Sequence, residues 1–266
     1  MDNRAIGVFD SGLGGLTCVR RLHETMPQES IIYFGDTGRV PYGTRGRDTI
    51  IKYARQDIRF LLGYDLKAIV VACNTASAAA LDTVRHEFDL PIFGTVEPSC
   101  DKARCVTREG RIGVIGTAAT VRSGIYEHRL RAADPALTVY TAACPLFVPL
   151  VENGRVHRGD IVIETVVREY LQPMRDAGVD TLILGCTHYP LLHDVIADFM
   201  GAGVTLVDSG AEAANAVRRA VEPAQVGAGG TQYFVSDDPQ GFAQLAGLFL
   251  QEDVHGEAGL IDISAY

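Results

Sequence analysis

Apolar residues follow two alternating patterns along this chain. Short runs rich in β-branched residues predict buried strands, and longer segments with apolar residues every three or four positions predict helices. The strands are expected at 6–9, 30–34, 68–71, 91–94, 112–115, 137–140, 181–184, 204–207 and 231–236. The helices are expected at 17–26, 47–63, 76–88, 121–131, 161–176, 190–200, 211–221 and 239–250. Strands that alternate with helices in this way are typical of an α/β protein with parallel sheets.

The second half of the chain repeats features of the first. The run Ile6-Gly7-Val8-Phe9-Asp10-Ser11 has a counterpart 106 residues later in Ile112-Gly113-Val114-Ile115-Gly116-Thr117. Two cysteines in similar surroundings, Cys73 and Cys186, are 113 positions apart. We therefore expect two similar α/β lobes related by a pseudo-two-fold axis, with a cleft between them at the carboxyl ends of both sheets.

The predicted lobes have definite boundaries. The first comprises residues 1–97 together with 208–266 and carries Cys73, and the second comprises residues 98–207 and carries Cys186. The C-terminal strand and helix have no counterpart after Gly94, so we expect them to pack back on the first lobe. The polar residues after position 250 are expected to be loosely held.

Length, net charge and the lack of long apolar stretches argue against several classes of protein. The chain has 266 residues, enough for one large domain or two small ones. Its formal net charge of −9 argues against a nucleic-acid or anionic-membrane partner. We find no apolar stretch long enough to span a bilayer and no secretory signal before the first strand, so we expect a cytoplasmic protein.

The chain contains 6 cysteines. A chain of this length buries its own core without disulfides, and the lack of a CxxC pair gives no reason to expect zinc or another metal. We interpret four of them as apolar fillers or incidental surface thiols, namely Cys18, Cys100, Cys105 and Cys144.

The other two cysteines occupy matching motifs, Ala72-Cys73-Asn74-Thr75 and Gly185-Cys186-Thr187-His188. Each follows a predicted strand and precedes a predicted helix. The partial positive charge of a helix N-terminus favours the thiolate form of a cysteine, which makes it reactive. Two such cysteines indicate a site built from both halves of the chain.

Two facing thiols predict a specific chemistry. If one is ionised and the other protonated, one removes a proton from a carbon while the other delivers a proton to the opposite face, which inverts a stereocentre. Candidates to assist the thiols are Asp10, Glu152 and His188. Taken one at a time, these three also fit an N-capping or solvated Asp, a helix-start or turn acid, and an ordinary loop histidine. The polar groups of Ser11, Asn74, Thr75 and Thr187 are candidates to hold the carboxylates and ammonium of an amino acid.

Several separated motifs together resemble the bacterial glutamate racemases: Asp10-Ser11-Gly12, Asp36-Thr37, Pro41-Tyr42-Gly43, Ala72-Cys73-Asn74-Thr75, Val96-Glu97-Pro98, Glu152-Asn153-Gly154 and Gly185-Cys186-Thr187-His188-Tyr189-Pro190. The resemblance implies interconversion of L- and D-glutamate without a cofactor, with D-glutamate entering peptidoglycan. It implies that Cys73 works on the D-enantiomer face and Cys186 on the L-face, assisted by Asp10, His188 and Glu152. It also implies four substrate-binding pairs, Asp10-Ser11, Tyr42-Gly43, Asn74-Thr75 and Thr187-His188, and it allows a homodimer.

Two other readings stay open at this point. The first is a racemase or decarboxylase that acts on another small acid. The second cysteine motif of the aspartate racemases, however, resembles Gly-Cys-Thr-Glu, without the histidine found here. The single-thiol decarboxylases keep only one of the two cysteines. A binding module that closes on an amino acid without chemistry is the second reading. Both thiols and the predicted cytoplasmic location argue against it.

Overall fold

The computed structural model describes residues 1–225, 229–252 and 257–266. Its strands form two parallel sheets, which confirms the predicted α/β class. The six-stranded sheet has the order β10-β9-β2-β1-β3-β4, and the four-stranded sheet has the order β6-β5-β7-β8. The first contains β1 (Ala5–Asp10), β2 (Ser30–Gly35), β3 (Leu66–Val71), β4 (Ile92–Gly94), β9 (Gly230–Val235) and β10 (Gly259–Leu260). The second contains β5 (Arg111–Gly116), β6 (Thr138–Ala143), β7 (Thr181–Gly185) and β8 (Thr205–Asp208).

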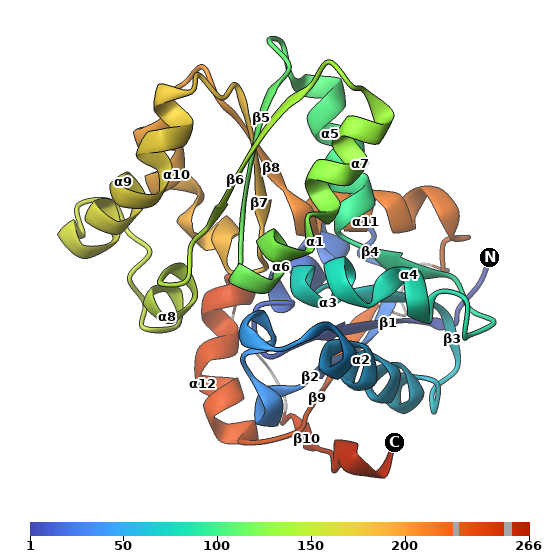
Figure 1. Ribbon diagram of the computed structural model, residues 1–266. Helices are drawn as coiled ribbons and strands as arrows, with labels where there is room; N and C mark the ends of the chain where they lie inside the picture. The colour runs from blue at the N-terminus through green and yellow to red at the C-terminus, as the bar shows by residue number, and fades with distance from the viewer. Residues whose placement is uncertain (226–228, 253–256) are drawn as a thin grey trace.

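Helices cover both sheets (Figure 1). They are α1 (Leu16–Thr25), α2 (Arg47–Leu61), α3 (Asn74–Ala79), α4 (Leu81–Val84), α5 (Val96–Val106), α6 (Ala118–Ser123), α7 (Ile125–Ala133), α8 (Phe147–Glu152), α9 (Ile161–Asp176), α10 (His193–Met200), α11 (Ser209–Ala220) and α12 (Pro239–Leu250). Four 3-10 turns add η1 (Thr37–Arg39), η2 (Tyr42–Thr44), η3 (Tyr189–Leu192) and η4 (Ile263–Ala265). In Figure 1, α5 and α7 lie on one side of the upper sheet, and α9 and α10 lie on the other.

Alternation along the strands explains why helices lie on both faces. In β1, Ile6 and Val8 belong to the apolar core that includes α1, whereas Phe9 belongs to the core that includes α2. Successive strand side chains point to opposite faces, so a strand buried on both faces reads as a continuous apolar run. The sequence shows such runs at β1 and β3.

The two halves share one topology, as the repeated sequence pattern predicts. The order β2-β1-β3-β4 in the first sheet matches β6-β5-β7-β8 in the second. The pairing register is also repeated, because Phe9 aligns with Val71 and Ile115 aligns with Leu184. This places the residues after β3 and after β7, including Cys73 and Cys186, at equivalent carboxyl ends.

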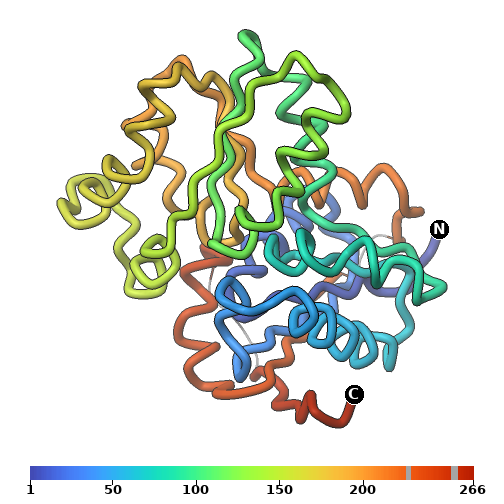
Figure 2. The backbone as a smooth tube through the Cα atoms, viewed as in Figure 1, coloured from blue at the N-terminus to red at the C-terminus, as the bar shows by residue number. Residues whose placement is uncertain are grey.

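The C-terminal segment returns to the first sheet, as expected. β9 pairs with β2, and β10 pairs with β9. Figure 2 shows this return as the orange and red end of the chain lying beside the blue start. The proposed boundary between residues 97 and 98 falls inside α5, which packs against α7 and β7 of the second half. The division at 1–97 plus 208–266 and 98–207 stays a prediction.

Two helix expectations were wrong, and two observed helices were not predicted. The single helix expected at 76–88 is divided at Ala80 into α3 and α4, and the one expected at 121–131 is divided at Gly124, whose φ is 65°. α5 and α8 were not predicted. Pro98 lies in the first turn of α5, where a proline is tolerated because its missing N–H has no helical partner.

The end of the chain is also more ordered than its polar composition suggested. Ile263 is buried, and the Tyr266 ring meets the Phe60 ring edge-on at a centroid distance of 5.5 Å. Ile261 also packs against the core, so a few separate side chains hold this segment without forming a periodic pattern.

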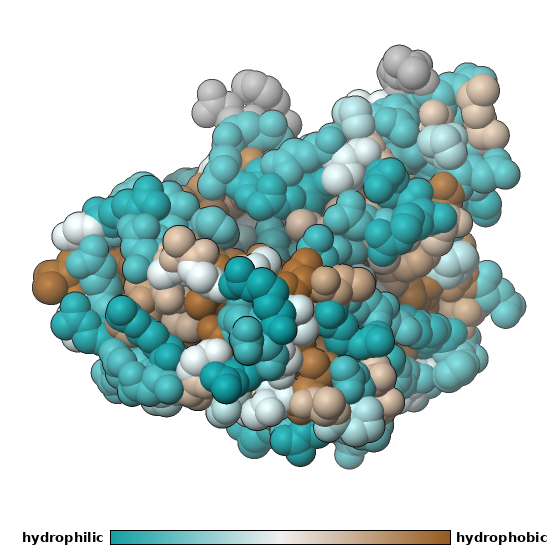
Figure 3. Space-filling view, turned by 90° about the horizontal axis from the view of Figure 1, so that it is seen from above, coloured by the Kyte–Doolittle hydropathy of each residue, from teal (hydrophilic) through white to brown (hydrophobic). Residues whose placement is uncertain are grey.

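The surface is largely hydrophilic, as expected for a globular protein (Figure 3). Figure 3 shows mostly hydrophilic side chains on the face seen from above, with apolar residues scattered among them. Among the helices in the described ranges, we find none with the length and apolar character required to cross a bilayer.

Candidate active site

A cleft of about 630 Å³ is lined by residues from both halves of the chain. All but one of the residues predicted for the site contribute to its walls: Ser11, Tyr42, Gly43, Cys73, Asn74 and Thr75 from the first half, and Glu152, Cys186, Thr187 and His188 from the second. The exception, Asp10, is fully buried at the end of β1. The carboxyl ends of parallel strands bring these residues together, because that edge is where open α/β sheets bind ligands.

Cys73 lies at the start of α3, as its motif predicted. It is the N-cap residue, and its Sγ accepts a hydrogen bond from the Ala76 N–H at 3.4 Å. The Ser11 hydroxyl is 3.5 Å from the same Sγ. Burial, and secondarily the Asp10 carboxyl, raise the pKa of the Cys73 thiol to about 12. The surroundings therefore favour the neutral thiol at this position.

Asp10 lies beneath the cleft, close to Cys73. Its Oδ2 accepts a hydrogen bond from the Gly12 N–H at 2.9 Å. Burial raises the pKa of Asp10, and His188 and the backbone N–H groups of the following loop offset this only in part. The loop fits closely around the carboxyl, because a Cβ at Gly15 would lie 2.4 Å from the Asp10 Cβ.

Cys186 has different neighbours, although its position in the fold is equivalent. Its Sγ lies 3.9 Å from Nδ1 of His188, and Nε2 of His188 lies 3.0 Å from Oε1 of Glu152 at the end of α8. Burial alone would lower the pKa of His188, but its contacts with Cys186 and Glu152 outweigh this and raise it to about 10. The Phe249 ring from α12 meets the imidazole edge-on at 5.2 Å between centroids. The expected helix N-terminus after Cys186 is the short turn η3.

Two of the expected binding residues use their side chains to join the halves. Nδ2 of Asn74 donates to the Tyr126 hydroxyl at 2.9 Å and to the Ser209 hydroxyl at 3.0 Å. The Thr75 and Thr117 hydroxyls are 2.9 Å apart. Asn74 is thus held by protein partners.

The Tyr42-Gly43 pair forms a wall of the cleft without directing the tyrosine hydroxyl into it. The Tyr42 hydroxyl donates to the buried carboxylates of Asp36 and Asp57. Arg39 pairs with the same two carboxylates, at 2.6 Å and 2.9 Å. A Cβ at Gly43 would lie 2.9 Å from the Thr117 Cβ, so glycine permits the close approach of the two halves here.

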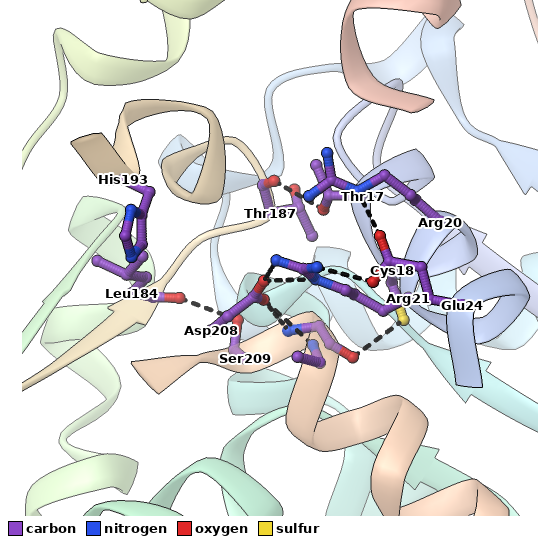
Figure 4. A network of polar contacts seen from close by, with 12 residues as sticks. Thr17, Cys18, Arg20, Arg21, Glu24, Leu184, Thr187, His193, Asp208 and Ser209 are labelled. Carbon is purple, nitrogen blue, oxygen red and sulfur yellow. Dashed lines mark hydrogen bonds and ion pairs between the residues drawn. The ribbon is translucent and has the colours of Figure 1, made fainter. Parts of the chain in front are cut away.

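Contacts behind the cleft hold α1 against the Cys186 loop and against the end of β8 (Figure 4). Thr17 donates from its hydroxyl to the Thr187 carbonyl at 2.9 Å, and Arg21 pairs with Asp208 at 3.0 Å. A Cβ at Gly14 would lie 2.1 Å from the Thr187 Oγ1, which explains a glycine at this position.

Sequence reasoning missed several residues that line the cleft. Thr117 is the counterpart of Ser11 in the repeated motif, so the 106-residue offset was a usable signal. Cys144, interpreted as a filler, also lines the cleft, as do Asp237, Phe242 and Leu245 from the C-terminal segment. Their sequence surroundings carry no motif. Within the described parts of the chain, no group of three or more His, Cys, Asp or Glu residues is placed to hold a metal ion.

Comparison with known proteins identifies close similarity along most of the chain. Residues 6–217 match a family model described as Asp/Glu/Hydantoin racemase. A glutamate racemase from Geobacter metallireducens is 46% identical over 252 residues, 93% of each chain. The solved glutamate racemase from Francisella tularensis in complex with D-glutamate is 36% identical, with a TM-score of 0.90 and 100% of both chains covered. The solved Thermus thermophilus glutamate racemase, in complex with beta-chloro-D-alanine, is 42% identical, with a TM-score of 0.89 and 99% of both chains covered.

Proposed function

The chain belongs to the Asp/Glu/Hydantoin racemase family, and we propose that it is a glutamate racemase that interconverts L- and D-glutamate by proton transfer at the α-carbon. The observation that carries this proposal is the cleft itself. It is lined by Cys73 and Cys186, which follow equivalent strands of two topologically matching sheets. A relative matched over 93% of its length and a solved structure matched over 100% of its length both bear the name glutamate racemase.

The reaction needs one acid and one base on opposite faces of the substrate. In the L-to-D direction, the Cys186 thiolate removes the α-proton and the Cys73 thiol delivers its own proton to the other face. D-glutamate leaves with Cys186 as the thiol and Cys73 as the thiolate, so atoms and charges balance without a cofactor. The reverse direction exchanges the two roles.

The neighbours of each cysteine support distinct assisting roles. His188 contacts Cys186, and Glu152 contacts His188; both assist proton transfer at Cys186. Asp10 lies beside Cys73 and assists it. We assign the substrate carboxylates and ammonium to Asp10, Ser11, Tyr42, Gly43, Asn74, Thr75, Thr187 and His188. Because the Asn74 amide and the Tyr42 hydroxyl already have protein partners, backbone groups of these two residues are the better candidates for substrate contact.

Glutamate is favoured over aspartate by the second cysteine motif. The second cysteine motif of the aspartate racemases resembles Gly-Cys-Thr-Glu, so they have a glutamate residue where this chain has His188. Here His188 contacts both Cys186 and Glu152. The product would supply peptidoglycan synthesis. The cytoplasmic location and the homodimer remain part of the proposal on the sequence argument alone.

Circular dichroism of L-glutamate with purified protein and no added cofactor, run in D2O, tests the proposal. We expect the optical signal to decay to zero while deuterium appears at the α-carbon, with L-aspartate in parallel unchanged. An unchanged L-glutamate signal would overturn the assignment. A changing L-aspartate signal would instead overturn the choice of substrate.

A further inference from the structure

The two cleft cysteines occupy equivalent positions in the fold but differ in their charged neighbours. Cys186 contacts a group that can carry positive charge, His188, whereas Cys73 lies beside an acid, Asp10. The exposed fractions of the two residues are nearly equal, 4% for Cys73 and 6% for Cys186. Access from the cleft therefore does not distinguish them, and the difference between them is electrostatic.

The surroundings of Cys186 favour an ion pair. His188 reaches Cys186 with Nδ1 and Glu152 with Nε2, and both ring nitrogens are donors only in the imidazolium. Glu152 is 40% exposed, so its carboxylate stays hydrated while it stabilises the imidazolium. The other titratable groups close to Cys186 are Cys144, Tyr189 and Cys73, none of which offers a positive charge. A positively charged histidine is one of the neighbours that lower the pKa of a cysteine thiol and favour its thiolate.

The surroundings of Cys73 disfavour charge. Its titratable neighbours are Asp10, Tyr33 and Cys186, all of which are neutral or negative. The contacts that would stabilise a thiolate here are neutral: the Ala76 N–H at the start of α3, at 3.4 Å, and the Ser11 hydroxyl, at 3.5 Å. Because Asp10 and Cys73 are both buried, a second negative charge beside the first would carry a large desolvation cost.

We propose that the free protein rests in one protonation state, with Cys186 as a thiolate paired with the His188 imidazolium and Cys73 as a neutral thiol. In combination with the proposed function, on which this consequence rests, the resting state is the one that accepts a proton from L-glutamate. D-glutamate requires the opposite state, which the protein reaches only after a proton moves from Cys73 to Cys186.

Competitive alkylation of the substrate-free wild-type protein tests the resting state directly. Limiting iodoacetamide at neutral pH forms a bond between a thiolate Sγ and the reagent's methylene carbon, and iodide leaves. Peptide mass spectrometry then reports each cysteine separately, with exposed Cys105 as an internal reference. We expect Cys186 to react at least about tenfold faster than Cys73, because the thiolate is the reacting form. Equal rates, or faster reaction at Cys73, would overturn the proposal.

Thiolate ultraviolet absorbance gives an independent readout. We expect an absorbance of one thiolate per chain at neutral pH that is lost in Cys186→Ser and in His188→Asn but kept in Cys73→Ser. Cys144→Ser is the matched control, because Cys144 is also buried and lines the same cleft. An absorbance that disappears in Cys73→Ser, or survives in Cys186→Ser, contradicts the assignment.

Racemisation assays on the same wild-type preparation separate this proposal from the proposed function. A protein that racemises glutamate but is alkylated first at Cys73 refutes only the resting state. A protein that carries the Cys186 thiolate but does not act on glutamate refutes only the racemase assignment.

Discussion

At the scale of single residues, the site combines equivalent positions with different chemistry. Cys73 and Cys186 follow matching strands, yet one has Asp10 and Ser11 as neighbours and the other has His188 and Glu152. The two faces of a chiral carbon are not equivalent inside a protein, so two proton carriers with separate partners suit an inversion. The fold gives the two cysteines equivalent positions, and the neighbouring side chains give each cysteine a different environment.

Loss of either cysteine should abolish racemisation. Cys73→Ala and Cys186→Ala each remove one proton carrier, and a positioned acid or base contributes about 10²–10⁴-fold to rate. We expect racemisation to fall by at least this factor, measured by circular dichroism of L- and D-glutamate. Cys100→Ala is the control, since it truncates a buried cysteine outside the cleft and should leave the rate unchanged. Near-normal racemisation in either cleft variant would remove that cysteine from the mechanism.

The raised pKa of His188 makes stability depend on pH. Its pKa rises from 6.5 to about 10 on folding, so the folded state holds a proton that the unfolded state releases between these values. The stabilisation is fully present below about pH 6.5 and is lost as pH rises toward about 10.

Comparison of His188→Asn with wild type isolates this contribution. In urea titrations across that pH range, the wild-type advantage in free energy of unfolding should shrink by about 1.5–3 kcal/mol, the contribution of a hydrogen bond to a charged group. A difference between the two proteins that does not vary with pH would show that His188 is not protonated in the folded state.

At the scale of elements, the repeated topology places a glycine at the same point of both first strands. A Cβ at Gly7 would lie 2.8 Å from Leu66 Cδ1, and a Cβ at Gly113 would lie 2.8 Å from Leu182 Cδ1. In both halves the missing side chain makes room for a leucine from the adjacent third strand.

Gly113→Ala should therefore destabilise the second sheet. Its Cβ would also meet Met174 Sδ at 3.0 Å and Val179 Cγ1 at 3.1 Å, so several core side chains must shift. Overpacking of this kind costs about 1–3 kcal/mol, which a denaturant melt would measure. The control is Gly203→Ala, where a Cβ meets nothing within 4 Å. If the two variants were equally stable, the core around β5 would be looser than these distances imply.

The sequence predicted most of the helices and every described strand except β10, because each of these has a strong local signal. Helix α9 (Ile161–Asp176) was predicted at its observed bounds, since its apolar residues recur regularly and Asp160 caps its first turn. The divisions at Ala80 and Gly124 were not predicted. At Ala80 no proline or glycine marks the break, and only the packing of α3 and α4 on their neighbours determines it.

At the scale of the whole molecule, the position of the cleft and the motif residues in its walls were predictable, but the long-range contacts that complete the walls were not. The rule that carboxyl ends of parallel strands meet at one edge brings together the residues after β1, β3, β5 and β7. The Tyr42 wall depends on a buried cluster in which Asp36 and Arg39 of the η1 turn meet Asp57 of α2. Phe242 and Leu245 reach the cleft only because the tail returns to β2. Such long-range contacts have no local pattern.

A buried ion pair stabilises the point where the start of the chain meets the beginning of the tail. Lys67 on β3 lies 2.5 Å from Glu29, and both side chains are almost fully buried. Lys67 also donates to the carbonyls of Asp2 and Glu222, and Glu29 accepts from the Ala224 N–H. The pair thus joins the N-terminus, two strands and the segment that leads into β9.

Removing one partner should destabilise the whole molecule, because it leaves the other charge buried. Breaking a buried pair costs about 3–5 kcal/mol, and we expect Glu29→Ala to fall at the lower end because Lys67 keeps two carbonyl acceptors. The control, Glu222→Gln, removes an exposed contact with the N-terminal amine and should change little. Urea melts followed by circular dichroism measure both.

Since the pair ties the tail to the first sheet, and the tail forms a wall of the cleft, Glu29→Ala should also raise KM for glutamate more than it lowers kcat. A stable Glu29→Ala protein with normal KM would show that the tail holds its place through β9 pairing alone.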